Sequence, residues 1–162
     1  MAAREKPDEI SDFHGLAGSS FEETLERLDR LDKIGIKPHP ATYAALLQSA
    51  GNRVQLDKGT LVHNHIVRYE YHEKDMALVG LILQMYRRCG SPQKAREWFD
   101  SRAKKNTYMW TCMIGAYCQY GYRKEALEIY EMLKQAELNP EKESFLSLVS
   151  VISGAENMED GR

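Results

Sequence analysis

The sequence predicts an all-α protein, a right-handed α-solenoid of antiparallel helix pairs and a truncated piece of a longer array. Three observations predict this fold. Seven residues between Glu23 and Gly59 are identical to the residue 102 positions further along. Apolar residues recur at i, i+3, i+4 and i+7 in successive segments, as in helices that bury one face. No segment alternates polar and apolar residues for long enough to indicate a strand.

The expected helices follow one another in pairs, and each pair forms one unit. Apolar stripes of the first helices run over residues 43–50, 79–86, 110–117 and 145–152. Those of the second helices run over residues 21–34, 62–69, 95–99 and 126–133. Gly90 and Gly121 lie between two helices, where a left-handed residue can end the first of them. Pro38 and Pro140 end units, because proline cannot continue a helix.

Counted from the helix starts, three complete units are 36, 31 and 35 residues long and cover 40–75, 76–106 and 107–141. Residues 20–39 hold the second helix of an incomplete unit, and residues 142–162 hold the first part of a further one. Residues 1–19 are expected to be an irregular lead-in. Such units cannot bury their apolar faces alone, so we expect them to stack around a shared core. An uncovered terminal unit would also favour self-association.

Composition and charge argue against several classes of protein. The net charge is −2 and the pI is near 6.2, so there is no overall basic field. No stretch approaches the roughly 20 apolar residues of a membrane span. The three cysteines form no C-x-x-C pair, and His63 and His65 point to different sides of a helix. We therefore expect no membrane contact, metal, cofactor or catalytic site within this chain.

Three groups of motifs show a resemblance to a known family. They are Gln84 to Ser91 followed by Ala95 to Asp100, Met113 to Gly121 with Glu125 to Tyr130, and Leu56 to Gly59 with Val62 and His63. They resemble, in that order, the short, standard and long motifs of pentatricopeptide repeat proteins. The chain is similar over residues 20–162 to the plant subclass in which these three motifs alternate. Residues 40–75 would be the long motif, 76–106 the short one and 107–141 the standard one.

The resemblance implies sequence-specific binding of single-stranded RNA in mitochondria or chloroplasts. It further implies a specificity factor for C-to-U RNA editing, with editing-complex proteins as candidate partners. The deaminase motifs H-x-E and C-x-x-C are absent from this chain, so a catalytic domain would lie elsewhere in the parent protein. Helical repeats can read one splayed base per unit with two or three side chains.

The resemblance also assigns individual residues. The fifth and last residues of each motif would read one base: Thr111 with Glu141, Gly80 with Asn106, and Ala44 with Asp75. Tyr108 and Ala77, the second residues of their motifs, would flank bases. Arg87 and Arg88 are candidate phosphate contacts, although cations also favour a helix C-terminus through the helix dipole. Gly80 has no side chain, so Asn106 would act alone in the short motif.

Two further assignments fall on incomplete units. His39 would be the last residue of the first unit, and Leu146 the fifth residue of the last one. A different class of function stays open beside RNA recognition. Tetratricopeptide-type scaffolds bind proteins with a similar helix-pair geometry but a constant period of 34 residues. The unequal unit lengths favour the RNA-binding alternative.

Overall fold

The computed structural model describes residues 20–138, 142 and 145–150. These residues are helical, without strands, and the all-α prediction is confirmed. The predicted lead-in over 1–19, Glu141, and most of the unit over 142–162 lie outside the described residues. The helices, in chain order, are α2 (Phe21–Lys33), α3 (Pro40–Asn52), α4 (Leu56–Arg68), α5 (Tyr71–Lys74), α6 (Met76–Arg88), α7 (Pro92–Ser101), α8 (Thr107–Gln119) and α9 (Arg123–Gln135).

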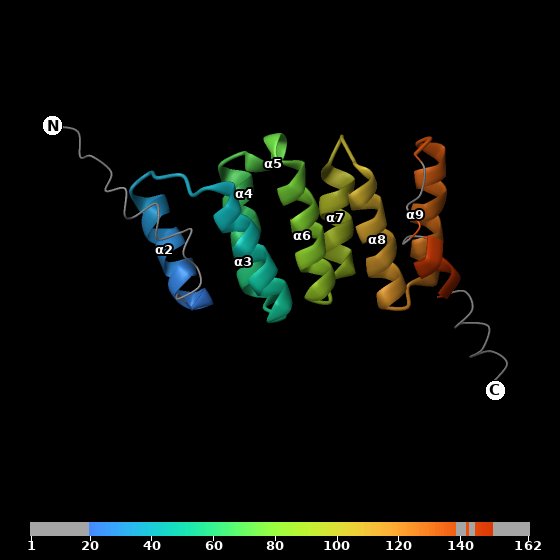
Figure 1. Cartoon of the computed structure of the whole chain (residues 1–162), viewed down its shortest axis with the longest axis horizontal. Coiled ribbons are helices and arrows are strands. Elements are labelled where there is room, and N and C mark those ends of the chain that lie inside the picture. The colour runs from blue at the N-terminus through green and yellow to red at the C-terminus, as the bar shows by residue number, and fades with distance from the viewer. Residues whose placement is uncertain (1–19, 139–141, 143–144, 151–162) are drawn as a thin grey trace.

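The helices lie side by side along the long axis, with α2 near one end and α9 near the other (Figure 1). Three helix pairs, α3 with α4, α6 with α7, and α8 with α9, pack within themselves. The first helices also pack directly on one another, α3 on α6 and α6 on α8. The result is a helical-repeat solenoid with a row of first helices and a row of second helices, as the repeat pattern predicts.

Helix ends in this array repeat the same backbone geometry. Gly35, Gly90 and Gly121 have φ between 73° and 77° directly after a helix and its C-cap. Their amides donate to carbonyls of the preceding turn, so they satisfy groups that the helix leaves unpaired. The predicted roles of Gly90 and Gly121 are confirmed. Val54, Glu70 and Glu137 adopt the same left-handed conformation without being glycine, at φ 55–58°.

One element was not predicted, the single-turn helix α5 between α4 and α6. It begins after Glu70, whose left-handed backbone turns the chain away from the end of α4. The hydroxyl group of Tyr71 in this turn donates to the carbonyl oxygen of Pro38 over 2.8 Å. The unit over 40–75 is longer than the unit over 76–106 because α4 is longer than α7 and because α5 follows α4.

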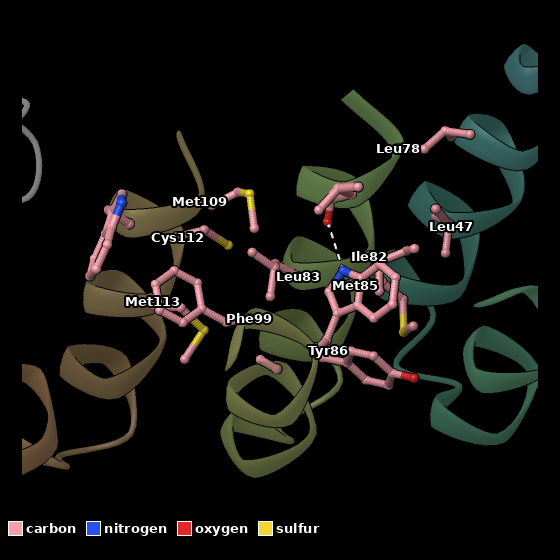
Figure 2. Close-up of a cluster of buried hydrophobic side chains, with 14 of the residues drawn as sticks. Leu47, Leu78, Ile82, Leu83, Met85, Tyr86, Phe99, Met109, Cys112 and Met113 are labelled. Carbon is pink, nitrogen blue, oxygen red and sulfur yellow. Dashed lines mark hydrogen bonds between the residues drawn. The ribbon is translucent and has the colours of Figure 1, made fainter. Parts of the chain in front are cut away.

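The core lies between the two rows of helices. Figure 2 shows the side chains of Leu83, Met109 and Phe99 gathered where α6, α7 and α8 meet, and all three are fully buried. The ring of Phe99 packs edge-on against Trp110 with centroids 4.8 Å apart. The indole nitrogen of Trp98 donates to the buried carbonyl oxygen of Val79 over 3.3 Å. Each such buried side chain contributes about 1.5–3 kcal/mol through the hydrophobic effect.

Ion pairs join the exposed faces of successive second helices. Lys58 contacts Glu22 at 2.7 Å, and Arg96 contacts Glu128 at 3.2 Å. Arg68 and the hydroxyl group of Tyr69 both donate to Asp32. The Tyr69 hydrogen bond, helped by Arg68, holds the pKa of Asp32 below its usual value. Because one member of each ion pair is solvent-exposed, the pairing adds little stability.

Candidate nucleic-acid interface

At three described unit boundaries, the last residue of one predicted unit caps the first helix of the next. His39 accepts from the amide of Ala41 at 3.1 Å, at the start of α3. Asp75 occupies the same place before α6, and its Oδ1 accepts from the amides of Ala77 at 3.0 Å and Leu78 at 3.2 Å. Side-chain oxygen atoms at this position satisfy amides that the helix leaves unpaired.

Asn106 caps α8 in the same way as Asp75 caps α6. Its Oδ1 accepts from the amide of Met109 at 2.9 Å. The cap fixes the orientation of the side chain and engages its acceptor, so the amide NH2 is the part suited to approach a base. Asp75 is half-buried and Asn106 is exposed. Asp75 and Asn106, two predicted readout residues at unit ends, therefore also stabilise helix starts.

The fifth residues of the motifs offer little side chain to a ligand. Ala44 is half-buried, and Gly80 is buried. Thr111 is 7% exposed, and its hydroxyl group donates to the carbonyl oxygen of Thr107 over 3.0 Å, one turn earlier in α8. The hydrogen bond and the burial restrict how Thr111 could meet a base. Its predicted partner Glu141 is not among the described residues.

Tyr108 and Gly80, assigned to different motifs, meet at the contact between α6 and α8. A Cβ atom placed on Gly80 would lie 2.6 Å from both Cδ1 and Cε1 of Tyr108. Real contacts do not come that close, so the tyrosine ring occupies the space of a side chain at position 80. Tyr108 nevertheless keeps 44% of its surface exposed. Ala77, at the same motif position in α6, is also exposed.

Arg87 and Arg88 reach in opposite directions from the end of α6. The Arg87 Nε donates to Gln119 over 3.0 Å, and its guanidinium group lies 2.7–3.0 Å from the place of a Cβ on Gly115. Arg88 donates to Asn52 in α3 over 2.7 Å and covers Gly51. The two arginines thus link α6 to the first helices on both sides. Arg87 is half-buried, whereas Arg88 is exposed.

A hollow of about 700 Å³ lies beside Arg87, between α6, α8 and the described part of the last unit. It combines two cations with hydroxyl and amide groups. The lining residues are Arg87, Gly115, Cys118, Gln119, Lys142, Leu146, Ser147 and Ser150. The same hollow therefore contains one predicted phosphate contact and Leu146, the predicted fifth residue of its unit. Such a set of donors is suited to an anion such as a phosphate group.

Sequence reasoning missed Gln119, Lys142 and the serines of this hollow. The apolar stripe in the sequence indicates the buried side of a helix. It does not indicate which polar residues of neighbouring units line the same hollow. We call the surface around Ala44, Ala77, Tyr108 and Arg87 the first-helix face. Among the described residues, no group of His, Cys, Asp or Glu could hold a metal ion, and no helix is long and apolar enough to cross a membrane.

Comparison with known proteins decides the family. The profile of the PPR repeat matches residues 108–138, which span most of α8 and all of α9. A chloroplastic pentatricopeptide repeat-containing protein of Arabidopsis thaliana is 34% identical over 128 residues, which cover 79% of this chain. The chain belongs to the pentatricopeptide repeat family.

Other relatives extend the similarity to most of the described repeats. A putative mitochondrial pentatricopeptide repeat-containing protein of Arabidopsis thaliana is 31% identical over 142 residues, or 86% of this chain. Another pentatricopeptide repeat-containing protein of that plant is 30% identical over 137 residues, or 85% of the chain. The chain spans only 14%, 22% and 20% of the lengths of these three relatives. It thus matches a segment of much longer pentatricopeptide repeat-containing proteins.

Proposed function

We propose that this chain is the RNA-contacting part of a longer organellar protein that binds single-stranded RNA with its first-helix face. One observation carries the proposal. The same polar capping position recurs at the start of α3, α6 and α8, occupied by His39, Asp75 and Asn106. A regular series of polar groups along one row of helices supports recognition of a regular polymer, with one unit for each nucleotide.

The hollow beside Arg87 supports the backbone half of this interaction. Phosphate neutralisation supplies most of the sequence-independent affinity for nucleic acids. Arg87 is already oriented by Gln119, and Lys142 adds a second positive charge to the same hollow. In this proposal the hollow takes one phosphate group, and Arg88, which reaches towards α3, contributes to the neighbouring backbone. The overall charge of −2 makes such local cations more important.

A more specific proposal concerns the organelle and the RNA-processing reaction in which this chain takes part. Relatives are named as chloroplastic or mitochondrial proteins, which supports an organellar location for this one. The unequal unit lengths of 36, 31 and 35 residues support the subclass with alternating long, short and standard motifs. In this subclass we propose a role as specificity factor for C-to-U editing, together with editing-complex proteins.

Fluorescence anisotropy of the chain with a labelled random pool of 12-nucleotide RNA tests the proposal. We expect binding to single strands that weakens steeply as salt is raised from 50 to 200 mM, and weaker binding to duplex RNA of equal length. Arg87→Gln should reduce the affinity and the salt dependence, whereas Lys94→Gln on the exposed side of α7 should change neither. Salt-independent peptide binding without RNA binding would favour the protein-binding scaffold instead.

Self-association belongs to the same proposal, because part of the last described helix is uncovered. Phe145 is 53% exposed and Val149 is 43% exposed, whereas Leu148 is buried. In an array, another unit would cover such a face. We propose that copies of this chain associate there. Light scattering should give a mass that rises with concentration and falls for Phe145→Ser, and a constant monomer mass would contradict it.

A further inference from the structure

The second helices share one register, so the grooves between them can be compared position by position. The helices begin at Phe21, Leu56, Pro92 and Arg123. The sixth residue is a glutamate in α2, α7 and α9, at Glu26, Glu97 and Glu128, but in α4 it is Leu61. Leu61 is 45% exposed. The groove that α4 shares with α2 therefore differs from the groove between α7 and α9.

Between α7 and α9, one arginine lies across the groove. Arg96 is the fifth residue of α7, and its Nε donates to both carboxylate oxygens of Asp100 at 2.9 Å. One terminal nitrogen donates to Glu128 over 3.2 Å and lies 4.0 Å from the sulfur atom of Met132. Only 22% of the Arg96 side chain stays exposed. This groove shows how two second helices hold a guanidinium group between them.

The groove between α2 and α4 keeps part of this arrangement but lacks the arginine. Leu25 takes its place, and Asp29 takes the place of its carboxylate partner in the same helix. Leu61 and His65 take the places of its two partners across the groove. A hollow of about 440 Å³ lies here instead. It is lined by Leu25, Glu26, Asp29, Arg30, Leu61 and His65.

His65 is the buried polar group of this hollow. It is 7% exposed, and its Nδ1 has no hydrogen-bond partner within the described part of the chain. A buried polar atom without a partner is costly. Burial lowers the pKa of the imidazole, so the ring is neutral at pH 7 and can accept a hydrogen bond. A donor group placed in the hollow would therefore find an uncharged acceptor.

The charges of the lining favour a cation. Two carboxylates, Glu26 and Asp29, stand against one guanidinium group, that of Arg30. Lys33 already pairs with Asp29 at 2.9 Å, whereas Glu26 has no ion pair among the described residues. The two leucines offer an apolar surface to an alkyl stem. An alkylguanidinium group combines such a stem with a positive charge and five donors.

We propose that the groove between α2 and α4 binds an alkylguanidinium group from outside the chain. The carbon stem lies on Leu25 and Leu61, and the head donates to Glu26. His65 accepts a further hydrogen bond. The group takes the place that Arg96 has between α7 and α9. An arginine side chain of another polypeptide or a free small molecule can supply it. The site lies on the row of second helices, so it does not depend on the proposed RNA binding.

A heteronuclear NMR titration of the chain with N-acetylarginine amide tests the site. We expect saturable shifts of amide signals around Glu26 and Leu61, with a Kd on the order of millimolar. N-acetylcitrulline amide, which carries an uncharged urea group, should bind at least about fivefold more weakly. Ethylguanidinium distinguishes the sources. If it binds as tightly as the arginine derivative, a free cation suffices, and weaker binding would show that the peptide part of an arginine residue contributes.

Substitutions locate the binding groups. Glu26→Gln should weaken binding about fivefold, and Arg30→Gln should strengthen it. Leu25→Arg places an arginine at the position of Arg96, so it should fill the groove from within and abolish binding. Glu128→Gln is the matched control, because it makes the same change at the same position of α9, and it should leave binding unchanged. Thermal melting verifies the fold of each variant.

Three results would overturn the proposal. The first is equal binding of the arginine and citrulline derivatives. The second is arginine binding that is unchanged in both Glu26→Gln and Leu25→Arg, or that shifts signals of α7 and α9 instead. The third is tighter binding of N-acetylglutamate amide than of the arginine derivative, which would show that Arg30 makes this hollow an anion site.

Discussion

The row of first helices and the row of second helices are held together in different ways. Where α6 meets α3 and α8, side chains lie directly over glycines of the neighbouring helices, as Arg88 does over Gly51 and Arg87 over Gly115. The second helices meet on their exposed sides through paired charges, such as Arg96 with Glu128. The first helices also pack directly on one another, α3 on α6 and α6 on α8, whereas the second helices are bridged by the ends of long side chains.

This difference explains how one array can combine a defined surface with tolerance to sequence change. A ligand-binding face needs fixed positions, and direct packing of each first helix on the next one fixes them. Exposed ion pairs constrain geometry weakly and add little energy. We therefore expect substitutions to have large effects in the core, intermediate effects in the first row and small effects on the outside of the second row.

The largest effect is expected where the two rows share their core. Phe99→Ala in α7 removes a fully buried ring that packs on Trp110. It should lower the free energy of unfolding by about 3–5 kcal/mol in urea titrations. Leu127→Ala in α9 is the matched control, because the Leu127 side chain is 36% exposed. This substitution should lower the free energy of unfolding by less than about 1 kcal/mol. Equal effects of the two substitutions would contradict the division between the core and the outer surface.

The second prediction tests the close packing of the first row. Alanine favours a helix over glycine by about 1 kcal/mol, but at Gly80 its Cβ would collide with Tyr108. Gly80→Ala alone should therefore destabilise the chain by about 1–2 kcal/mol. In a Tyr108→Ala background the same change should become stabilising. A thermodynamic cycle of the four variants measures this, and stabilisation by Gly80→Ala in the native background would refute the contact.

A third prediction concerns the helix ends within the first row. The chain after α6 and α8 turns at Gly90 and Gly121, but after α3 it turns at Val54, a β-branched residue at φ 55°. Val54 is 62% exposed, so little core packing is lost when it is replaced. Val54→Gly should raise stability by about 1 kcal/mol, and Gly90→Val should lower it by a similar or larger amount. Unchanged urea midpoints in both variants would argue against backbone strain at this turn.

The smallest effect is expected on the outside of the second row. Glu128→Gln removes the charge that faces Arg96 at 3.2 Å, while Arg96 keeps Asp100 at 2.9 Å. The loss should be about 0.5 kcal/mol or less, and it should shrink further as salt screens the pair. Urea titrations at low and high salt measure it. A loss comparable with that of Gly80→Ala would mean that both rows depend equally on their lateral contacts.

The sequence predicted the helices well because each buries one face, and apolar periodicity records that burial directly. Helices α3, α6 and α8 begin at Pro40, Met76 and Thr107, the residues from which the units were counted. The assignment of these units to long, short and standard motifs stays a prediction. Helix α5 was missed because a single turn leaves no periodic pattern.

The candidate site was less predictable, because it depends on contacts between units. The unit boundaries counted from the sequence assign Gly80 and Tyr108 to different motifs. The two residues come into contact only because α8 packs on α6. Capping by Asp75 and Asn106 could have been inferred from Asp and Asn directly before helix starts. The hollow beside Arg87 could not, because Lys142 reaches it from the next unit.

The most direct test of the proposed interface is ultraviolet crosslinking of the chain to a single-stranded RNA selected for binding from a random 12-nucleotide pool, followed by mass spectrometry of the crosslinked peptides. The account predicts crosslinks in α6 and α8, with Tyr108 prominent, and none on the exposed faces of α7 and α9. Competition with unlabelled RNA should remove them. Crosslinks confined to the second helices would contradict the assignment of RNA binding to the first-helix face.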